Sequence, residues 1–370
     1  MTNESIHTVQ ESILPEPVPA LAHVTRVREA GTETLPFIGL DRNERVSPFP
    51  GWFMEKLRTA LTSKTLNRYP LRDRLHRRLA ESLHLPEENL LLTPGSDGAL
   101  KYLFQAYVRP FDEVVMLDPS YAMYPVYARM HQAKVVLIPY RPDRTLDKEA
   151  MLERIQPGVR LILLANPNQP VGTLMDESLL RAVLEQAREI RALVAVDEAY
   201  YPFSGFTAVS WIETCPHLLV IRTFSKAAGL AGLRMGYAVG HPGVLGNLFK
   251  VHAANDINSF GILCACLVLE HPEIIEDYVQ EVRAGGKLLS DKARVLGLEP
   301  LPCAANFLLI RVTNRCSPER LIEQLKQRNY LVKGPFSAPC LQGCIRITLG
   351  PPEMMTRFAE VLAEAVTAAV

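Results

Sequence analysis

The sequence predicts an α/β protein with a large domain built on a mixed, mostly parallel sheet and a smaller α+β domain at its C-terminal end. The chain has 370 residues, more than the ~250–300 that usually share one hydrophobic core. Between residues 90 and about 225, short runs that are apolar throughout alternate with helical patterns, as in a sheet covered by helices on both faces. After about residue 275, a long helical pattern leads into two strand patterns with a helix between them.

The expected elements of the large domain follow in order along the chain. Strand patterns occupy 90–93 (LLLT), 113–118 (EVVMLD) and 161–165 (LILLA), and two more begin at residues 193 and 218. A helix starts in PGSDGALKYLFQAY, directly after the first strand. Segment 176–191 has apolar residues at helical spacing with Asp176 as a plausible N-cap, so we expect a further helix between the strands at 161 and 193.

We expect three parts: an N-terminal arm over residues 1–45, a large domain over 46–275 and a small domain over 276–370. The arm is polar, contains the run LPEPVP and has weak periodicity, which is typical of a segment outside a core. In the small domain, EIIEDYVQEVRAGGKLLSDKARVLG predicts a long helix, ANFLLIRV and CIRITLG predict strands, and SPERLIEQLKQRN predicts a helix between them.

Charge and composition exclude several functional classes. Lys and Arg (40) balance Asp and Glu (40), so no basic field indicates nucleic acid or an anionic membrane surface. The longest apolar runs are too short to span a bilayer, and the N-terminus lacks the pattern of a signal peptide. Seven scattered cysteines without a CxxC pair and nine histidines without metal spacing predict reduced, inert thiols, no metal site and a cytoplasmic protein.

Polar residues follow the ends of the predicted strands. Ligands of open α/β sheets bind outside the carboxyl ends of the strands, so side chains at these ends converge if the strands form one sheet. The strand ends carry Gly95, Ser96 and Asp97, the segments 118–121, 166–172 and 197–200, and Thr223, Ser225 and Lys226.

The residue types at these ends match the needs of one cofactor. A lysine amine such as that of Lys226 can form an imine with an aldehyde, and a carboxylate such as Asp197 can hold the proton of a pyridine ring. A helix start with small residues, joined by Arg234, makes a phosphate cup. A tyrosine ring such as Tyr121 can stack on a flat heterocycle. Together these groups indicate pyridoxal 5′-phosphate.

Motifs in order along the chain carry a family resemblance. The sequence resembles the fold-type I pyridoxal-phosphate aminotransferases, most closely the histidinol-phosphate aminotransferase family, from about residue 39 to about residue 355. The motifs are NRYP (67–70), GSDGAL (95–100), DPSYAMY (118–124), NPNQPVGT (166–173), VAVDEAYYPFS (194–204), IRTFSKAAGLAGLRMGY (221–237), ANFLL (305–309) and IRITLG (345–350).

The resemblance implies roles at the cofactor ring. Lys226 would carry the cofactor as a Schiff base and then act as the acid and base of proton transfer. Asp197 would pair with the pyridine nitrogen, and Tyr200 would hydrogen-bond the phenolic oxygen. Tyr121 would stack on the ring. A lone loop lysine is more often a solvated surface residue, but Asp197 lies 29 residues before Lys226 and Arg234 eight after it, which favours the catalytic role.

The resemblance also implies the remaining contacts. Arg346 would bind the anionic group of the substrate. Tyr69 would reach the cofactor phosphate of a second subunit in a homodimer with shared active sites, and the N-terminal arm would cross the dimer interface. The phosphate would be held by Gly95, Ser96, Asp97, Thr223, Ser225 and Arg234.

Three departures from the family pattern concern the cofactor's oxygen and the substrate. Gln169 replaces the asparagine that touches the phenolic oxygen, so either Gln169 or Asn168 would serve. Lys333 replaces a second substrate-binding arginine, which exchanges a bidentate fork for a point charge. The arm also lacks the tyrosine that the family places near its start. We therefore expect an amino donor other than histidinol phosphate.

The expected reaction is transfer of an amino group between an amino acid or amino-alcohol phosphate donor and a 2-oxo acid. A decarboxylase or lyase on the same fold, similar to threonine-phosphate decarboxylases, is an alternative that the motifs around Lys226 do not separate. A non-enzymatic regulator is a remote alternative, because the short, non-basic arm has no room for a DNA-binding domain. We interpret Tyr124, Tyr127 and Tyr201 as structural and assign Glu198 no role.

Overall fold

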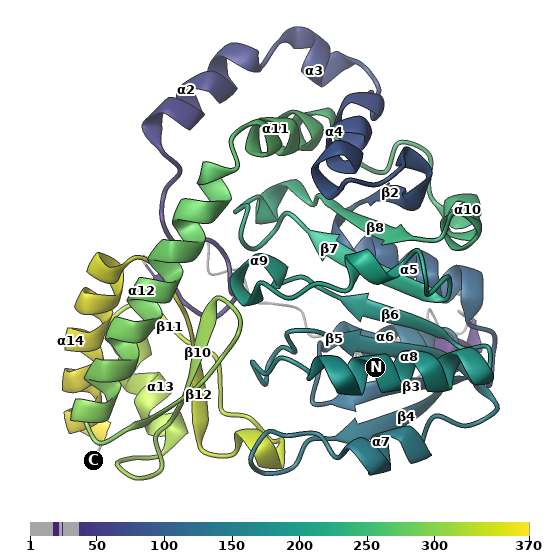
Figure 1. The fold of residues 1–370 in the computed structure, drawn as a ribbon. Coiled ribbons are helices and arrows are strands. Elements are labelled where there is room, and N and C mark those ends of the chain that lie inside the picture. The colour runs from purple at the N-terminus through teal and green to yellow at the C-terminus, as the bar shows by residue number, and fades with distance from the viewer. Residues whose placement is uncertain (1–17, 22–23, 25–36, 370) are drawn as a thin grey trace, which may run out of the picture.

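The computed structural model describes residues 18–21, 24 and 37–369. Most of the expected N-terminal arm therefore lies outside the described residues. A seven-stranded sheet forms one side of the molecule, and a C-terminal unit of helices and short strands lies beside it (Figure 1).

The large sheet has the order β2-β8-β7-β6-β5-β3-β4, and β8 alone runs antiparallel to its neighbours. The predicted mixed, mostly parallel sheet is thus confirmed. Its strands are β2 (Leu90–Thr93), β3 (Glu113–Asp118), β4 (Lys134–Pro139), β5 (Val159–Ala165), β6 (Leu193–Asp197), β7 (Leu218–Thr223) and β8 (Gly236–Gly240).

Each face of this sheet buries its own hydrophobic cluster. Alternate residues of β6 separate, with Leu193 and Ala195 in one cluster and Val194 and Val196 in the other, as the period of two in a strand requires. One face packs against α5 (Gly95–Tyr107), α6 (Met123–Met130) and α10 (Pro242–Val251). The other face is covered by α4 (Asp73–Leu83), α7 (Lys148–Glu153), α8 (Glu177–Glu189) and α11 (Ser259–Glu270).

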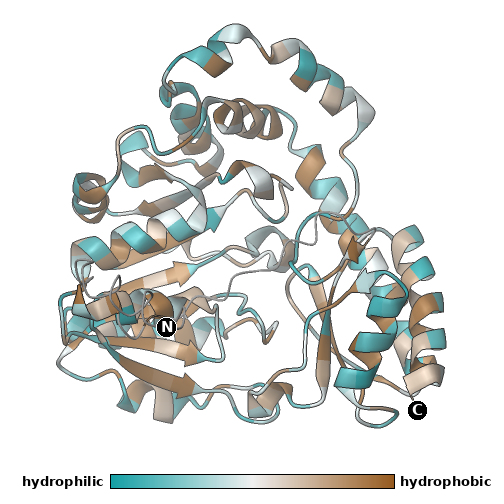
Figure 2. Cartoon of the chain, turned by 180° about the vertical axis from the view of Figure 1, so that it is seen from behind, coloured by the Kyte–Doolittle hydropathy of each residue, from teal (hydrophilic) through white to brown (hydrophobic). Residues whose placement is uncertain are grey.

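Helix α8 forms as its sequence predicts. The Asp176 side chain accepts hydrogen bonds from the backbone N–H groups of Ser178 and Leu179, which satisfies donors that have no partner inside the helix. The buried face of α8 contains the apolar residues expected from the spacing. Figure 2 shows the result: the strands are largely hydrophobic, and the covering helices carry both hydrophobic and hydrophilic residues.

The C-terminal unit contains two small sheets and three helices. A three-stranded antiparallel sheet has the order β12-β10-β9, and β1 pairs in parallel with β11. The domain boundary at residues 275/276 stays a prediction. The elements are β1 (Ile38–Gly39), α12 (Glu273–Val295), β9 (Glu299–Leu301), β10 (Phe307–Arg311), α13 (Pro318–Gln327), β11 (Tyr330–Leu331), β12 (Cys344–Thr348) and α14 (Pro352–Ala369).

Short helices complete the described chain. Two of them, α2 and α3, form an arch over α11 and lead into α4 (Figure 1). Their bounds and those of the remaining short helices are α2 (Gly51–Ala60), α3 (Ser63–Asn67), α9 (Tyr201–Ser204) and the 3₁₀ turns Pro19–Leu21, Glu87–Asn89, Val209–Trp211, Ala231–Leu233 and Pro339–Leu341.

The glycine-rich stretch after Lys226 forms part of the large sheet and is not a flexible loop. It contains β8, a fully buried strand that lies between β2 and β7. A Cβ atom on Gly236 would lie 2.5 Å from the backbone of Gly95 and 2.8 Å from the carbonyl oxygen of Arg222. Glycine is required at this position because two backbones pack against it, and the strand thereby fixes the start of α5.

All seven cysteines are free. Among the described residues, no group of three or more His, Cys, Asp or Glu side chains is arranged to hold a metal ion. In the same part of the chain, none of the helices combines the length and the apolar character needed to cross a membrane.

Candidate active site

Neighbouring strands deliver the two central side chains. Asp197 is the last residue of β6, and Lys226 follows the end of β7 by three residues. These strands are parallel neighbours, with Asp197 opposite Ile221. Both side chains therefore lie at the carboxyl edge of the sheet, where ligands of open α/β sheets bind.

Asp197 is a buried carboxylate with two hydrogen bonds. Its Oδ2 accepts the hydroxyl of Tyr124 at 2.8 Å, and its Oδ1 accepts the backbone N–H of Ala199 at 3.1 Å. Burial raises the pKa of Asp197 to about 6, although both hydrogen bonds act to lower it. A carboxylate kept ionised inside the protein suits a cationic partner such as a protonated ring nitrogen.

Lys226 has the character of a reactive amine. Its Nζ donates to the backbone carbonyl of Arg42 at 3.1 Å. Burial lowers its pKa to about 8, the nearby Glu44 carboxylate opposes this shift, and the cations Arg346 and Arg234 add to it. A larger share of the amine is therefore neutral near pH 7 than for an exposed lysine, which favours attack on an aldehyde.

The start of α5 has the features expected of a phosphate cup, which stays a prediction. Helix α5 begins at Gly95, and no side chain caps its first backbone N–H groups. Gly95 has a φ of 73°, and a Cβ atom at this position would lie 2.9 Å from Nη2 of Arg234. The cradle fits a phosphate group because free helix N–H groups and a guanidinium face the same place and only glycine leaves room between them.

The residues after β7 line the same cup. Arg234 has a φ of 53°, and this left-handed conformation turns its side chain back toward α5, where Nη2 lies 3.4 Å from Oδ2 of Asp97. Its Nη1 donates to Oγ of Ser225 at 3.4 Å. The hydroxyl of Thr223 donates to the same Ser225 Oγ at 2.9 Å. The structure thus brings together Gly95, Ser96, Asp97, Thr223, Ser225 and Arg234.

Tyr121 joins this group through Asp97. Its hydroxyl donates to the Asp97 carboxylate at 3.1 and 3.3 Å, and burial raises its pKa. Its ring packs edge-on against Tyr124, with centroids 5.6 Å apart and planes at 83°. Stacking of Tyr121 on the cofactor stays a prediction.

A segment before the large sheet contacts three predicted site residues in succession. The carbonyl of Asp41 accepts from Nη2 of Arg346 at 2.6 Å. The carbonyl of Arg42 accepts from Lys226. Nδ2 of Asn43 donates to the hydroxyl oxygen of Tyr200 at 2.9 Å. Residues 41–43 therefore connect the side chains expected to bind substrate and cofactor.

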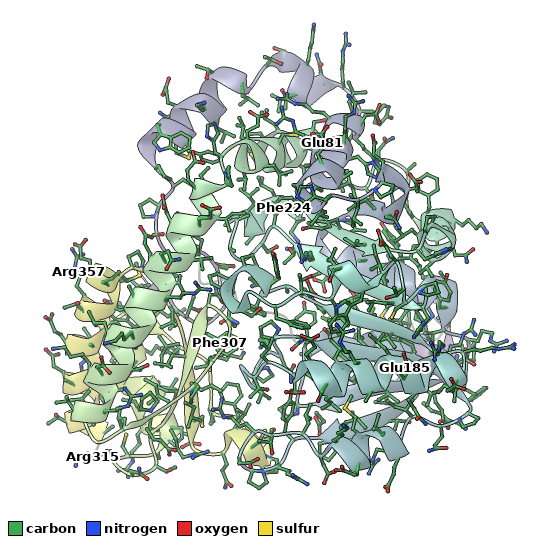
Figure 3. All side chains as sticks on the ribbon, in the orientation of Figure 1. Glu81, Glu185, Phe224, Phe307, Arg315 and Arg357 are labelled. Carbon is green, nitrogen blue, oxygen red and sulfur yellow. The ribbon has the colours of Figure 1, made fainter. Side chains whose placement is uncertain are left out.

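Arg346 is a buried cation with spare donors. It lies on β12 with 4% of its surface exposed, and its Cζ is 5.3 Å from the ring centre of Phe307. Figure 3 labels Phe307, which lies on β10 of the C-terminal unit, on the side toward the large sheet. Within the described residues, Nε and Nη1 of Arg346 are buried without a hydrogen-bond partner. Such donors are costly to leave unpaired, so they indicate a site for an anion.

Lys333 lies directly across from Arg346. The two residues exchange both backbone hydrogen bonds, at 3.0 and 2.8 Å. Residues paired in this way project their side chains from the same face of a sheet. Lys333 is exposed, so its positive charge lies nearer the solvent than the buried guanidinium of Arg346 on the same face of the sheet.

The side-chain amides of Asn168 and Gln169 differ in their hydrogen bonding. Oδ1 of Asn168 accepts from Ser120 at 2.8 Å, and its Nδ2 donates to the carbonyl of Pro119 at 2.8 Å and to Tyr140 at 3.0 Å. Its amide is committed to holding neighbouring loops together. Gln169 is half-buried, and in the described part of the chain its amide forms no hydrogen bond. Of the two predicted candidates, Gln169 has the amide available for a ligand.

Tyr69 stands apart from the other predicted residues. It lies between α3 and α4 with 80% of its surface exposed, and the nearby side chains of Leu66 and Leu71 are also largely exposed. Its predicted contact with a second subunit's cofactor stays a prediction.

Sequence reasoning missed two residues that contact the predicted site. Tyr124, which we interpreted as structural, is fully buried and donates to Asp197. Its sequence signal is its place in the motif DPSYAMY, three residues after Tyr121, against whose ring it packs. Asn43 lies in the polar stretch DRNER, which we had assigned to the arm. Glu198, to which we gave no role, forms a buried ion pair with Arg222 at 2.8 Å.

Comparisons with known proteins agree with this geometry. Residues 37–362 match the family described as Aminotransferase class I and II. The chain is 36% identical to histidinol-phosphate aminotransferase 1 of Ralstonia nicotianae over 91% of this chain and 92% of that protein. It is 32% identical to histidinol-phosphate aminotransferase 1 of Carboxydothermus hydrogenoformans, over 88% of this chain and 92% of that protein.

Solved structures share the fold. The crystal structure of histidinol-phosphate aminotransferase from Sinorhizobium meliloti, in complex with pyridoxal-5′-phosphate, has a TM-score of 0.86 at 24% identity and covers 97% of this chain and 100% of that chain. An aspartate aminotransferase mutant from Thermus thermophilus has a TM-score of 0.77 at 24% identity, over 89% of this chain and 91% of that chain.

Proposed function

The chain belongs to the class I and II aminotransferase family and is a pyridoxal-phosphate-dependent transaminase that acts on amino and oxo acids; from that premise we propose which residues act and what kind of donor it takes. We propose that the donor is an amino acid or amino-alcohol phosphate whose anionic group binds Arg346. One observation carries this proposal: two donor nitrogens of Arg346 are buried and unpartnered among the described residues.

The cofactor supplies, when bound, an aldehyde that accepts the amino group and a ring that withdraws electrons from the donor's Cα. Lys226 would hold the cofactor covalently through Nζ. As a free amine, the same Nζ would be the base that takes the proton from the donor's Cα and the acid that gives it back. Because burial lowers the pKa of Lys226 to about 8, its free amine can act as a base near neutral pH.

The other residues hold and orient. Asp197 would keep a proton on the ring nitrogen, and Tyr124 holds the Asp197 carboxylate in place. The start of α5 and Arg234 would anchor the phosphate. Tyr200 and Gln169 would donate to the phenolic oxygen, and Tyr121 would cover the ring.

The side chains expected to contact the substrate favour an anionic donor but do not identify it. Arg346 is buried and presents a planar fork, whereas Lys333 beside it is exposed and presents a single charge. An ammonium binds an anion with less geometric selectivity than a guanidinium. We propose that Lys333 contacts a second anionic or polar group of the substrate, and that the donor differs from histidinol phosphate.

A rapid-mixing screen of amino donors tests the proposal. The enzyme is mixed with histidinol phosphate, unphosphorylated histidinol, glutamate and aromatic amino acids, and loss of the visible absorbance of the bound cofactor is followed. We expect fast conversion with at least one anionic donor and release of its oxo product. Release of CO₂ without oxo product from every reactive donor would favour the decarboxylase alternative, which nothing in the comparisons supports. Lys226→Ala is the inactive control.

We also propose a cytoplasmic homodimer in which Tyr69 completes the site of the other subunit. Its exposure, shared with Leu66 and Leu71, supports this arrangement. Mixing unfolded Lys226→Ala and Tyr69→Ala chains and refolding them together tests it. A hybrid dimer would contain one site with both Lys226 and Tyr69, so activity should return. If the mixture is no more active than the two variants refolded separately, Tyr69 does not act across subunits.

A further inference from the structure

Asn43 uses all of its polar groups to connect Tyr200 with the C-terminal sheet. Its backbone N–H donates to Oγ1 of Thr348 at 2.9 Å, and its carbonyl accepts from Nδ2 of Asn306 at 3.0 Å. Its side-chain Oδ1 accepts from Thr348 at 3.4 Å, and its Nδ2 donates to the hydroxyl oxygen of Tyr200 at 2.9 Å. Only 2% of Asn43 is exposed, so water does not compete for these bonds.

We propose that Asn43 is a positioning residue that directs the hydroxyl proton of Tyr200 toward the bound cofactor. The proposal rests on the proposed function, in which Tyr200 donates to the phenolic oxygen of pyridoxal phosphate. It adds that this donation depends on a residue from a segment that precedes the large sheet, 157 positions away in sequence.

The direction of the hydrogen bond carries the argument. The amide nitrogen of Asn43 can only donate, so the oxygen of Tyr200 must accept. The phenol's own proton is then left for another acceptor. A hydroxyl that accepts one hydrogen bond is a stronger donor in the next, and the effect is largest where water is excluded. Tyr200 is itself buried, with 6% of its surface exposed.

Charged groups and an aromatic ring surround Tyr200. The Arg346 guanidinium acts to lower the pKa of Tyr200, and the Asp197 carboxylate acts to raise it. The ammonium of Lys226 lies 6.0 Å from the ring centre, and the Phe307 ring packs edge-on at 5.8 Å. Among these groups, Asn43 is the one that hydrogen-bonds the hydroxyl oxygen.

The backbone of Asn43 offers a clean variant. Its φ is 56°, in the left-handed region, which glycine adopts without strain. Asn43→Gly should therefore keep the backbone bonds to Thr348 and Asn306 while it removes the donor to Tyr200. Asn43→Ala would mix the loss of the amide with backbone strain and is less informative.

The test is a pH titration of the visible absorbance of the holoenzyme, which follows the proton on the Lys226 nitrogen. Donation from Tyr200 stabilises negative charge on the phenolic oxygen and so lowers the proton affinity of that nitrogen. We expect Asn43→Gly to move the midpoint upward by about half a pH unit, as expected for a weakened neutral hydrogen bond. Tyr200→Phe should move it further in the same direction.

The double variant Asn43→Gly/Tyr200→Phe decides whether Asn43 acts through Tyr200. We expect its midpoint to equal that of Tyr200→Phe, with thermal unfolding of the apoenzyme confirming that the variants fold. An unchanged midpoint in Asn43→Gly beside a shifted Tyr200→Phe would overturn the role of Asn43 alone. A shift that persists in the Tyr200→Phe background would show that Asn43 acts through the backbone. No shift in Tyr200→Phe would overturn the role given to Tyr200 itself.

Discussion

The hydroxyl of Tyr124 lies 2.8 Å from Oδ2 of Asp197, and both groups are buried. The tyrosine comes from α6 on one face of the sheet, whereas Asp197 ends a central strand. A neutral donor therefore stabilises the charge of the carboxylate without competing for it as a cation would.

Replacing Tyr124 with phenylalanine should raise the pKa of Asp197 above its value of about 6. A hydrogen bond to a charged group is worth about 1.5–3 kcal/mol, which corresponds to roughly one to two pH units. In the apoenzyme, the pH range over which ionisation of Asp197 lowers stability should move to higher pH by this amount, as urea denaturation at several pH values measures. Tyr107→Phe is the control, because it removes a tyrosine hydroxyl at the C-terminal end of α5 that donates to the carbonyl of Val244. An unmoved pH range would show that Tyr124 does not act on Asp197.

Replacing Arg346 with lysine should impair donors that carry a carboxylate or phosphate. The charge remains, but the buried fork that can bind two oxygens is lost, so we expect kcat/KM to fall about 100-fold. The matched control is Arg311→Lys on neighbouring β10, where Arg311 pairs with Glu299 at 3.0 Å. Steady-state kinetics with the best donor measure both. Equal losses in the two variants would contradict an anion site at Arg346.

Adding a methyl group at Gly95 should weaken cofactor binding. The new Cβ would lie 2.9 Å from Nη2 of Arg234 and the position requires a φ of 73°, so Gly95→Ala displaces the guanidinium and strains the start of α5. Fluorescence titration of the apoenzyme should show at least a tenfold higher Kd for pyridoxal phosphate. Gly232→Ala is the control, because a Cβ there meets nothing within 4 Å. A normal Kd in Gly95→Ala would exclude the cup.

Asp197→Asn should remove the pH dependence that Asp197 gives to the stability of the apoenzyme. Burial raises the pKa of Asp197 from 3.8 to about 6, so the folded state binds this proton more tightly than the unfolded state. The wild type therefore loses stability as pH rises through about 6. The free energy of unfolding of the variant relative to wild type should increase by roughly 1.4 kcal/mol between pH 5 and pH 8. Urea denaturation at both pH values measures this, and a pH-independent difference would contradict it.

The apoenzyme should capture the cofactor with an unusual pH dependence. Because burial lowers the pKa of Lys226 from 10.5 to about 8, the reactive neutral amine is populated two to three pH units earlier than in an exposed lysine. The rate at which visible absorbance appears after mixing with pyridoxal phosphate should rise with a midpoint near pH 8. A rate that increases only near pH 10 would show that Lys226 is not desolvated.

Local patterns were sufficient for most of the large sheet. Apolar runs located β2, β3, β5, β6 and β7, and the parallel order then placed Asp197 and Lys226 at one edge. The strand β8 was hidden because its glycines resemble a turn. Gly236 must be glycine because the backbones of Gly95 and Arg222 pack against it. The residues around position 236 in the sequence do not reveal that packing.

The missed site residues depend on contacts between distant segments. Asn43 meets Thr348 across 305 positions, and nothing near residue 43 signals that contact. Tyr124 has the sequence features of any core tyrosine. Its hydroxyl reaches Asp197 only because α6 packs against the sheet next to β6. Motif resemblance pointed to residues that the fold gathers at one edge of the sheet, whereas the residues that support them could be found only from the fold.

The pairing of β1 with β11 has a consequence for how the protein is made. Ile38 and Gly39 leave the ribosome early, but Tyr330 and Leu331 follow almost three hundred residues later. Until then Asp41 and Asn43 lack their contacts with Arg346 and Thr348 of the C-terminal sheet, and contacts of such long range form slowly. The nascent chain can build its parallel strands first, yet the neighbourhood of Lys226 closes only when synthesis is nearly complete. A product truncated before β11 would keep Lys226 and residues 41–43 but would lack the C-terminal strands that hold those residues in place.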